Sequence, residues 1–244
     1  MRCGCPTTAT FGNIAAMKLD LLGSKHTLFR LFYRLGFTPW DGHPLAQSLR
    51  NLVEGNDSQG SPALTAAAAL ELGCGTGDTS IYLAKRGWQV TAVDFVPSAL
   101  EKARAKARVD NITVNFVHAD VRHLRQAGIN GPMQLIVDNG CLHNMNDDDR
   151  DSYVREVSAV AAPDAGLVIV AFVPGGRFGV RGIDRSEMER RFASGWTLVS
   201  AGEEQVLDRE KTPTRYYLFQ RAAQVSESCQ PISCEQRPLR NTVK

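Results

Sequence analysis

One stretch decides the fold: Ala68-Ala69-Leu70-Glu71-Leu72-Gly73-Cys74-Gly75-Thr76-Gly77-Asp78. Its apolar first half predicts a buried parallel strand, and its alternating glycines predict a tight turn that leads into a helix. Glycine allows positive φ and lets the backbone approach a ligand closely. We therefore expect this turn to hold a small molecule at the carboxyl end of a central strand, where open α/β sheets bind their ligands.

The residues around the turn narrow the choice of ligand. A dinucleotide-binding turn, G-x-G-x-x-G, would place a glycine where this chain has Asp78, and a carboxylate at a helix N-terminus disfavours a pyrophosphate. No Gly-Lys-Ser/Thr follows, so the turn is not a P-loop. The next apolar run ends in Asp94, about 17 residues beyond Gly77, where a carboxylate typically accepts hydrogen bonds from ribose hydroxyls. A ligand with a ribose, no phosphate and a charged amino-acid tail fits, and S-adenosylmethionine (SAM) has these parts.

At these positions the sequence resembles the class I SAM-dependent methyltransferases. The pattern Glu71-x-Gly73-x-Gly75-x-Gly77 followed by Asp94 is similar to their first two motifs. The resemblance covers roughly residues 36–221 and implies an α/β fold. The expected sheet is Rossmann-like, doubly wound and seven-stranded, and it is mostly parallel with an antiparallel last strand. After the first strand, further strands are expected at 89–94, 112–117, 133–137, 166–173, 196–200 and 216–219.

Composition divides the chain into four segments. Residues 1–16 are small and polar and are expected to be a disordered N-terminus. Residues 17–65 are interpreted as an N-terminal helical lid and linker, and residues 66–221 as the SAM-binding methyltransferase domain. Residues 222–244 are polar and without periodicity, which predicts a disordered C-terminal tail.

Charge and cysteine usage limit the partners and the compartment. A net charge of +2 over 244 residues gives no strong field toward nucleic acid or anionic lipid. No apolar stretch approaches the roughly 20 residues that span a bilayer, and the first residues lack the apolar core of a signal peptide. Two of the six cysteines, Cys74 and Cys141, fall in the predicted cleft, and the spacings of the others match no common zinc pattern. We expect a cytoplasmic monomer or homodimer without a metal, a nucleic-acid partner or a membrane partner.

The resemblance also implies which residues hold SAM. In the family, an acid that follows the third strand of the sheet accepts a hydrogen bond from the adenine amino group. The resemblance implies that Asp120 has this role here. The local alternative is a helix N-cap for the segment that follows Asp120, and the two roles are compatible. The full set of expected cofactor-binding residues is Trp40, Glu71, Gly73, Cys74, Gly75, Gly77, Asp78, Asp94, Phe95, Asp120, Val121, Asp138 and Asn139.

A turn before the core also resembles one family group. The run Pro39-Trp40-Asp41 is similar to a turn in methyltransferases of the thiopurine and tellurite groups. The resemblance implies that Trp40 caps the cofactor while the N-terminal helix, with apolar residues at helical spacing up to Leu35, closes an acceptor pocket. The alternative is that Trp40 only packs this helix onto the domain.

The loop after the fourth strand carries the candidate chemistry. The run Asp138-Asn139-Gly140-Cys141-Leu142-His143 contains an Asp-x-Gly-x-Leu pattern that resembles the thiopurine methyltransferase group. His143 is the candidate general base because its ordinary pKa lies near neutrality. The alternative is that His143 orders the loop through a backbone hydrogen bond. Asp138 is expected to contact the methionine amino group or the acceptor.

These features favour transfer of a methyl group from SAM to an O, N or S atom of a small, aromatic or heterocyclic molecule. Methyl transfer is an in-line displacement in which positioning can supply roughly 7–11 kcal/mol, so a dedicated base is not always needed. The overall pattern also resembles actinobacterial enzymes that methylate hydroxyquinolines. Two other classes stay open: a non-catalytic SAM-binding regulatory protein, and a dinucleotide-dependent oxidoreductase. Nucleic-acid methylation is disfavoured because no Asp/Asn-Pro-Pro-Tyr/Phe run follows the fourth strand.

Overall fold

The computed structural model describes residues 25–35, 38, 41–42, 44–55, 62–175, 180–204 and 213–222. Residues 1–16 and 223–244, in the two ends predicted to be disordered, lie outside the described residues, and so does Trp40. Of the predicted N-terminal helix up to Leu35, the described part is α2 (Lys25–Leu35).

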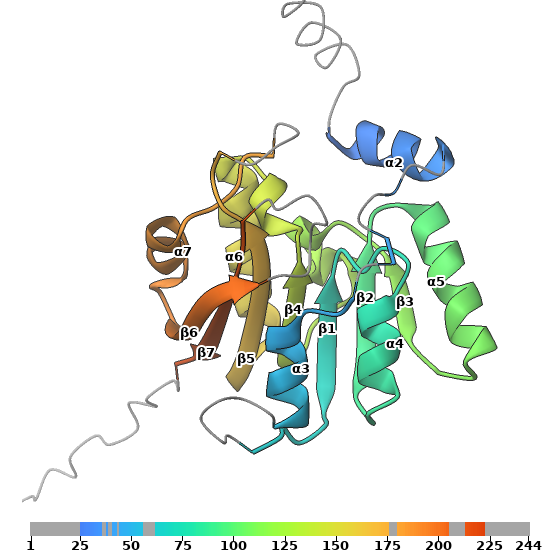
Figure 1. Cartoon of the computed structure of the whole chain (residues 1–244), viewed down its shortest axis with the longest axis horizontal. Coiled ribbons are helices and arrows are strands. Elements are labelled where there is room, and N and C mark those ends of the chain that lie inside the picture. The colour runs from blue at the N-terminus through green and yellow to red at the C-terminus, as the bar shows by residue number, and fades with distance from the viewer. Residues whose placement is uncertain are drawn as a thin grey trace, which may run out of the picture.

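A seven-stranded sheet with the order β3-β2-β1-β4-β5-β7-β6 forms the centre of the molecule (Figure 1). The strands from β3 to β5 are mutually parallel, whereas β7 runs antiparallel to both of its neighbours. This arrangement confirms the predicted sheet and its antiparallel last strand. The strands are β1 (Ala68–Leu72), β2 (Gln89–Asp94), β3 (Asn115–His118), β4 (Met133–Asn139), β5 (Ala161–Phe172), β6 (Trp196–Glu204) and β7 (Thr214–Arg221).

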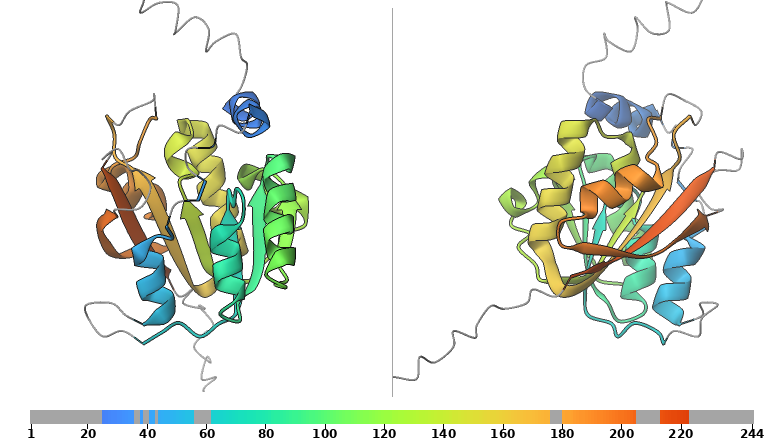
Figure 2. Two further views of the ribbon diagram at one scale, coloured as in Figure 1. Left: turned by 45° about the vertical axis from the view of Figure 1, so that its right-hand side comes forward. Right: turned by 90° about the vertical axis from the view of Figure 1, so that its left-hand side faces the viewer.

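Helices cover both faces of the sheet. The helices α3 (Gln47–Glu54), α4 (Asp78–Ala84) and α5 (Pro97–Val109) pack on one face, and α6 (Asp147–Val160) and α7 (Arg185–Phe192) pack on the other. Figures 1 and 2 show α2 above the carboxyl ends of the strands, apart from both helical layers. We call this end of the sheet, where β1 to β4 stop and their loops begin, the carboxyl edge.

The central strands are apolar on both faces because each face meets a helical layer. In β4, Leu135 and Val137 contact the layer of α3, α4 and α5, whereas Ile136 between them contacts the layer of α6 and α7. All three are fully buried. The near-continuous apolar run of this strand therefore reflects burial from two sides, with no alternation of polar residues.

Several strand boundaries differ from the predicted ones. The third strand begins at Asn115 rather than at residue 112, because the backbone N–H of Ile112 donates to Ala107 at the end of α5, 2.9 Å away, and Asn111 takes a positive φ of 55°. This turn uses the first residues of the apolar run. The fifth strand begins at Ala161 rather than at residue 166, and the fourth extends through Asn139 rather than ending at residue 137.

The segment before the core contributes two helices with different surroundings. The buried side chains of Leu49 and Val53 join α3 to the core on the sheet. The carboxylate of Glu204 accepts from the backbone N–H groups of Gln47 and Ser48, at 3.2 and 3.0 Å, and so caps the positive N-terminus of α3. Helix α3 is thus part of the body of the domain, whereas α2 lies across the carboxyl edge.

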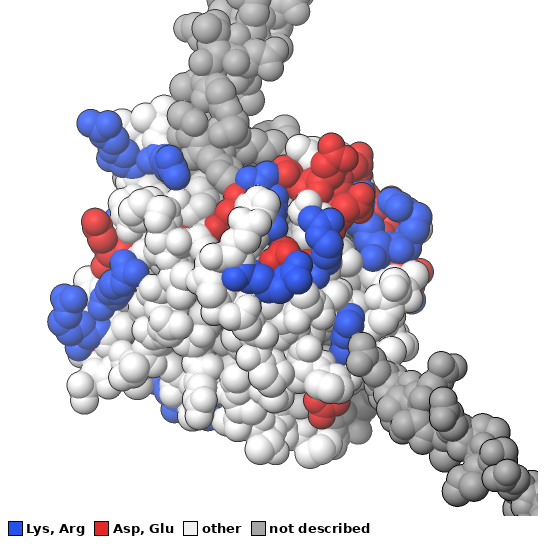
Figure 3. Space-filling model, turned by 180° about the vertical axis from the view of Figure 1, so that it is seen from behind, with Lys and Arg blue, Asp and Glu red and all other residues white. Residues whose placement is uncertain are grey.

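The molecular surface mixes charges of both signs. Figure 3 shows acidic side chains gathered beside basic ones on the face opposite to that of Figure 1. Several of these charges form ion pairs, such as Arg181 and Arg191 with Asp147, and Arg191 with Asp151. None of the helices in the described part of the chain has both the length and the apolar character needed to cross a bilayer.

Candidate cofactor site and active site

The glycine turn has the geometry that its sequence predicts. Gly73, Gly75 and Gly77 have φ values of 65°, 53° and 83°, in the left-handed region. A Cβ atom at position 77 would lie 2.9 Å from Cβ of Ala103 and 3.2 Å from the Phe116 ring. Gly77 therefore allows α5 and β3 to pack against the turn, while Gly73 and Gly75 form its exposed corner.

The carboxylate of Asp94 joins the glycine turn to the next strand. Its oxygens accept from the backbone N–H groups of Gly75 and Val96, each at 2.8 Å. Asp94 is buried, with 6% of its surface exposed, and this burial raises its pKa while the two backbone N–H groups lower it. The acid predicted to bind ribose thus lies directly against the glycine turn.

A residue that the sequence analysis missed lies at the same turn. Tyr33 of α2 is 6% exposed and packs against Val96 and Ala99 at the start of α5. Its hydroxyl oxygen would be 3.0 Å from a Cβ atom at position 75, so a side chain there would press on it. The apolar spacing of α2 marks Tyr33 as a helix-face residue, but no sequence signal connects it with Gly75, about 40 residues away.

A polar cluster ties the turn to the segment before α3. The hydroxyl of Thr76 donates to the carboxylate of Asp41, and the ammonium group of Lys106 donates to Thr76 at 2.7 Å and to Asp78 at 2.9 Å. Asp41 is the last residue of the Pro-Trp-Asp run, and this residue is held against the glycine turn. The prediction that Trp40 caps the cofactor lies outside the described residues and stays a prediction.

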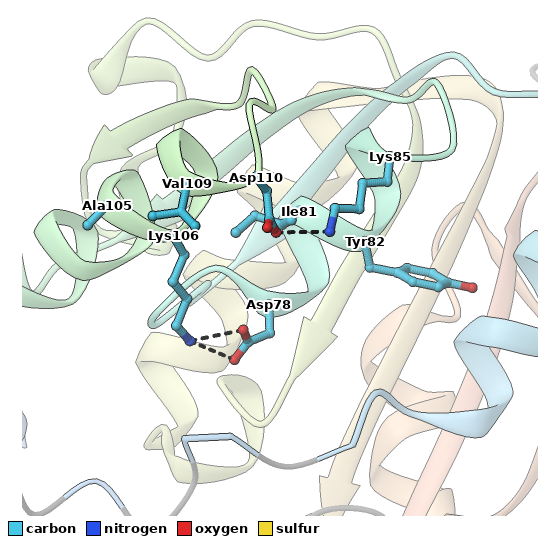
Figure 4. A pocket seen from close by; sticks show the side chains of 8 residues that line it. All are labelled: Asp78, Ile81, Tyr82, Lys85, Ala105, Lys106, Val109 and Asp110. Carbon is cyan, nitrogen blue, oxygen red and sulfur yellow. Dashed lines mark hydrogen bonds and ion pairs between the residues drawn. The ribbon is translucent and has the colours of Figure 1, made fainter.

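The side chain of Asp78 forms an ion pair with a lysine of α5. Its side chain is exposed, points toward α5 and forms an ion pair with Lys106 (Figure 4). Both residues line a pocket of about 550 Å³ between α4 and α5, on the helical side of the turn. Because Lys106 pairs with Asp78, the carboxylate repels a pyrophosphate less than the sequence indicated. The predicted contact of Asp78 with the cofactor stays a prediction.

Glu71 is buried at the end of β1 and caps the following helix. It is 3% exposed, and its carboxylate accepts from the hydroxyl of Ser80 in the first turn of α4. Burial raises the pKa of Glu71 to about 8, against the hydrogen bonds from Ser80 and Thr79, which lower it. The side chain is therefore largely protonated at neutral pH, which removes most of the cost of burying a charge.

Asn139 leaves an acceptor at the carboxyl edge. Its Nδ2 donates to the hydroxyl of Thr79 at 3.0 Å, and its Oδ1 is buried without a partner among the described residues. An unsatisfied buried carbonyl oxygen is costly. A ligand with an N–H donor at this position would satisfy it, and the ammonium group of the methionine part of SAM is such a donor.

Asp120 stands two residues beyond β3 and caps the short 3-10 turn η1 (Val121–His123). Its Oδ1 accepts from the backbone N–H of Arg122 at 2.9 Å, and both of its oxygens contact the Arg122 guanidinium. The N-cap that the sequence offered as the alternative role is therefore present. The side chain of Val121 is buried in the core.

The remaining predicted contacts lie close to these groups. Phe95 follows Asp94 and packs against the cluster around Tyr33. The Cys74 side chain is buried in the core, and the Cys141 Sγ would lie 3.2 Å from a Cβ atom at Gly73. Burial raises the pKa of both thiols. Within the described ranges, no group of three or more His, Cys, Asp or Glu residues is arranged to hold a metal ion.

Asp138 accepts hydrogen bonds from the loop after β4. This carboxylate is fully buried and accepts from the backbone N–H groups of Gly140, Cys141 and Leu142, at 2.9, 2.6 and 3.0 Å. The hydroxyl of Tyr153 in α6 donates to it at 2.7 Å. Asp138 therefore holds the loop after β4 from inside, and its predicted contact with the methionine or the acceptor stays a prediction.

His143 lies in the same loop with little exposed surface. It is 3% exposed, and its ring centroid lies 4.8 Å from that of Phe172. The backbone N–H of Phe172 donates to its Nδ1 at 3.4 Å, a long hydrogen bond that in a neutral ring leaves the proton on Nε2. This arrangement favours the alternative from the sequence, in which His143 orders the loop.

The fold and the groups at the carboxyl edge are those expected of a SAM-dependent methyltransferase, and comparison with known proteins points to the same class. Residues 69–164 match a family model described as a methyltransferase domain. Through this core, which is less than half of the chain, the chain is similar to the SAM-dependent methyltransferases. The family resemblance stated from Glu71, the three glycines and Asp94 is confirmed.

Individual relatives agree with this class. The chain is 30% identical over 136 residues to a 2-heptyl-1-hydroxyquinolin-4(1H)-one methyltransferase from Mycobacteroides abscessus. The aligned residues cover 55% of this chain and 56% of that relative. It is 40% identical over 79 residues to a SAM-dependent Diels-Alderase from Talaromyces variabilis, covering 31% and 26%. The matched stretches thus span about half or less of these two relatives.

A solved structure has the same fold over a greater length. A 1,6-didemethyltoxoflavin-N1-methyltransferase from Burkholderia thailandensis matches with a TM-score of 0.62 at 22% identity, covering 90% of this chain and 93% of that one. That structure contains S-adenosylhomocysteine (SAH), the product that remains when SAM loses its methyl group.

The role of Asp138 predicts a loss of stability. In Asp138→Ala, the N–H groups of the loop and the Tyr153 hydroxyl lose their common acceptor inside the core. We expect the free energy of unfolding in urea to fall by about 3 kcal/mol or more. The control Tyr153→Phe removes one donor and should cost only about 1 kcal/mol. An Asp138→Ala protein that is as stable as the wild type but does not bind SAH would contradict this structural role and would show that Asp138 contacts the ligand.

The raised pKa of Glu71 predicts a pH dependence. Between pH 4.5, its ordinary pKa, and about 8, the folded state keeps a proton that the unfolded state loses, so the free energy of unfolding falls as pH rises. Measured in urea, the stability of the wild type minus that of Glu71→Gln should fall by about 3 kcal/mol between pH 5.5 and 8.5. The control Glu101→Gln, at an exposed position, should follow the wild type, and a constant difference for Glu71→Gln would contradict the buried acid.

Proposed function

We propose that this protein transfers a methyl group from SAM to an O, N or S atom of a small aromatic or heterocyclic molecule. The observation that carries the proposal is the joint between the glycine turn and Asp94 at the carboxyl edge of a methyltransferase domain. SAM supplies a methyl group on a sulfonium, which is a good leaving group. The protein's main task is then to align the acceptor with this methyl group and to keep water out.

Each part of the cofactor has a matching residue at the carboxyl edge. In the proposed complex Asp94 accepts hydrogen bonds from the ribose hydroxyls, and Asp120 accepts from the adenine amino group. Asn139 offers its Oδ1, for which the described part of the chain supplies no partner, to the methionine ammonium group. Support comes from the place of these residues, which follow or end the strands β2, β3 and β4 at one edge of the sheet.

The acceptor is proposed to lie between the loop after β4 and α2. Helix α2 lies above this edge, and Tyr33 brings it into contact with the glycine turn. His143 and Phe172 supply rings at the end of β4 and β5. The heterocycle named for the mycobacterial relative supports an aromatic acceptor, and the mixed surface charge in Figure 3 fits a small molecule better than nucleic acid.

Proton removal from the acceptor is proposed not to depend on Nδ1 of His143. That atom faces the backbone N–H of Phe172. Phenols and hydroxyquinolines release their proton more readily than aliphatic alcohols, so alignment alone suffices for acceptors of this kind. In this proposal His143 shapes the acceptor side of the site.

The test is a direct search for the transferred methyl group. The full-length protein is incubated with SAM and a panel of phenols, hydroxyquinolines and thiols, and mass spectrometry follows both SAH and a product that is heavier by one CH₂. We expect equal amounts of both from at least one heterocycle. Binding of SAM without transfer to any acceptor in the panel would favour another use of SAM, as in the name of the Talaromyces relative.

Loss of the ribose contact should weaken cofactor binding. In the wild type, the two oxygens of Asp94 accept from the backbone N–H groups of Gly75 and Val96. In Asp94→Asn the amide has only one acceptor oxygen, so it cannot make both of these hydrogen bonds and also accept from the ribose. We expect the Kd for SAH, measured by calorimetry, to rise at least about 10-fold. The control Asp164→Asn, at an exposed position on β5, should bind as the wild type does. An unchanged Kd for Asp94→Asn would show that the ribose site lies elsewhere.

Removal of one hydroxyl tests the contact between α2 and the turn. Tyr33→Phe keeps the ring that packs on Val96 and Ala99 but loses the oxygen at Gly75. We expect the Kd for SAH to rise by about 5-fold, with an unchanged thermal unfolding midpoint. Lys102→Met, whose ammonium group lies 5.8 Å from the centroid of the Tyr33 ring, is the control and should leave the Kd unchanged. If Tyr33→Phe and the wild type bind SAH with equal affinity, the Tyr33 hydroxyl of α2 does not contribute to the cofactor site.

A further inference from the structure

We propose that Arg122 is a positioning residue for adenine recognition: it fixes the carboxylate of Asp120 so that the site selects a purine with a 6-amino group. The inference rests on the proposed cofactor and adds a residue to its site. It is carried by the contacts between Arg122, Asp120 and Asp149, which join the end of β3 to the first turn of α6.

Arg122 holds Asp120 through both backbone and side chain. Its backbone N–H donates to Oδ1 of Asp120 at 2.9 Å. Its Nε lies 2.9 Å from Oδ1 and 3.1 Å from Oδ2, and its terminal NH2 group lies 2.6 Å from Oδ2. Contacts on both oxygens restrict rotation of the carboxylate about its last bond, so Arg122 holds Asp120 in one orientation.

Arg122 is itself anchored at its other end. The second terminal nitrogen of its guanidinium donates to the carboxylate of Asp149. Asp149 lies in the first turn of α6, where its backbone N–H donates to the capping side chain of Asn146 at 2.8 Å. About a quarter of each side chain is exposed, 25% for Arg122 and 27% for Asp149. The guanidinium is thus fixed between two carboxylates from different elements.

An arginine is needed for this geometry. Its planar guanidinium offers several N–H donors in one fork, so it can bind two carboxylates at once in fixed directions. A lysine would supply the charge at one point, without the grip on both oxygens of Asp120. The hydrogen bonds with Asp120 and Asp149 raise the pKa of Arg122 well above its usual range, so the guanidinium is charged at neutral pH.

A carboxylate that is held in one orientation distinguishes a purine with a 6-amino group from one without it better than a mobile carboxylate does. The 6-amino group of adenine donates to a correctly placed carboxylate oxygen, whereas a purine with hydrogen at this position offers no donor. If Arg122 no longer holds Asp120, the carboxylate turns to solvent and its preference for the amino group is lost. Arg122 would therefore affect the selectivity for the base more than the affinity for the rest of the cofactor.

Calorimetric titration with two ligands tests this role. The first ligand is SAH, and the second is its analogue in which hydrogen replaces the 6-amino group of the purine. We expect the wild type to prefer SAH by about 10-fold, the value of one hydrogen bond to a charged group. In Arg122→Met this preference should fall to about 2-fold or less, and Arg122→Lys should lie between the two.

Arg125, three residues after Arg122, provides a matched control because it also pairs with an acid of α6. Its side chain pairs with Glu156 of α6, with NH2 at 2.8 Å from the carboxylate, but none of its contacts reaches Asp120. Arg125→Met should therefore keep the full preference for SAH while losing a comparable ion pair. Asp149→Asn, which weakens only the outer anchor, should lower the preference in part, and thermal unfolding identifies any variant that no longer folds.

The outcomes separate the proposal from the cofactor assignment. A full preference in Arg122→Met, together with its loss in Asp120→Asn, would overturn the role of Arg122 while keeping that of Asp120. An equal loss in Arg122→Met and Arg125→Met would reduce both arginines to general stabilisers and overturn the proposal as well. Failure of the wild type to bind either ligand would instead contradict the proposed cofactor, on which the role of Arg122 depends.

Discussion

The carboxylate of Asp94 is the contact on which the carboxyl edge depends. It binds the backbone N–H groups of Gly75 and Val96, so one side chain fixes both the glycine turn after β1 and the start of the chain after β2. Two adjacent parallel strands would otherwise end in loops with unpaired donors. In the proposed complex the same carboxylate also accepts hydrogen bonds from the ribose hydroxyls, so the interaction that holds the turn would orient a binding group.

The other loops of this edge are held in the same way. Asp120 caps η1, Asp138 binds the N–H groups of the loop after β4, and Glu71 caps α4. Each acid lies at or shortly after the end of a strand and turns at least part of its carboxylate to the protein itself. Of these four acids, Asp94 and Asp120 are the two that the proposed complex places against the cofactor. Acid positions at the ends of strands therefore give the location of the site, but not which acids contact the ligand.

The sequence predicted the sheet and the ends of its strands because those follow from local patterns. Apolar runs, alternating glycines and Asp94 are all readable within about 30 residues. The roles of Asp138 and Asp78 could not be predicted, since their partners Tyr153 and Lys106 come from helices whose placement depends on tertiary packing. Tyr33 was missed for the same reason: its contact with Gly75 exists only once α2 crosses the carboxyl edge.

The most direct test of the central claim is a calorimetric titration of the purified protein with SAH, with NADH as the comparison ligand. We expect micromolar binding of SAH and none of NADH, because the turn offers backbone groups and Asp94 to a ribose but no G-x-G-x-x-G cradle for a pyrophosphate. Tight binding of NADH without binding of SAH would contradict it and would assign the glycine turn to the dinucleotide-binding class.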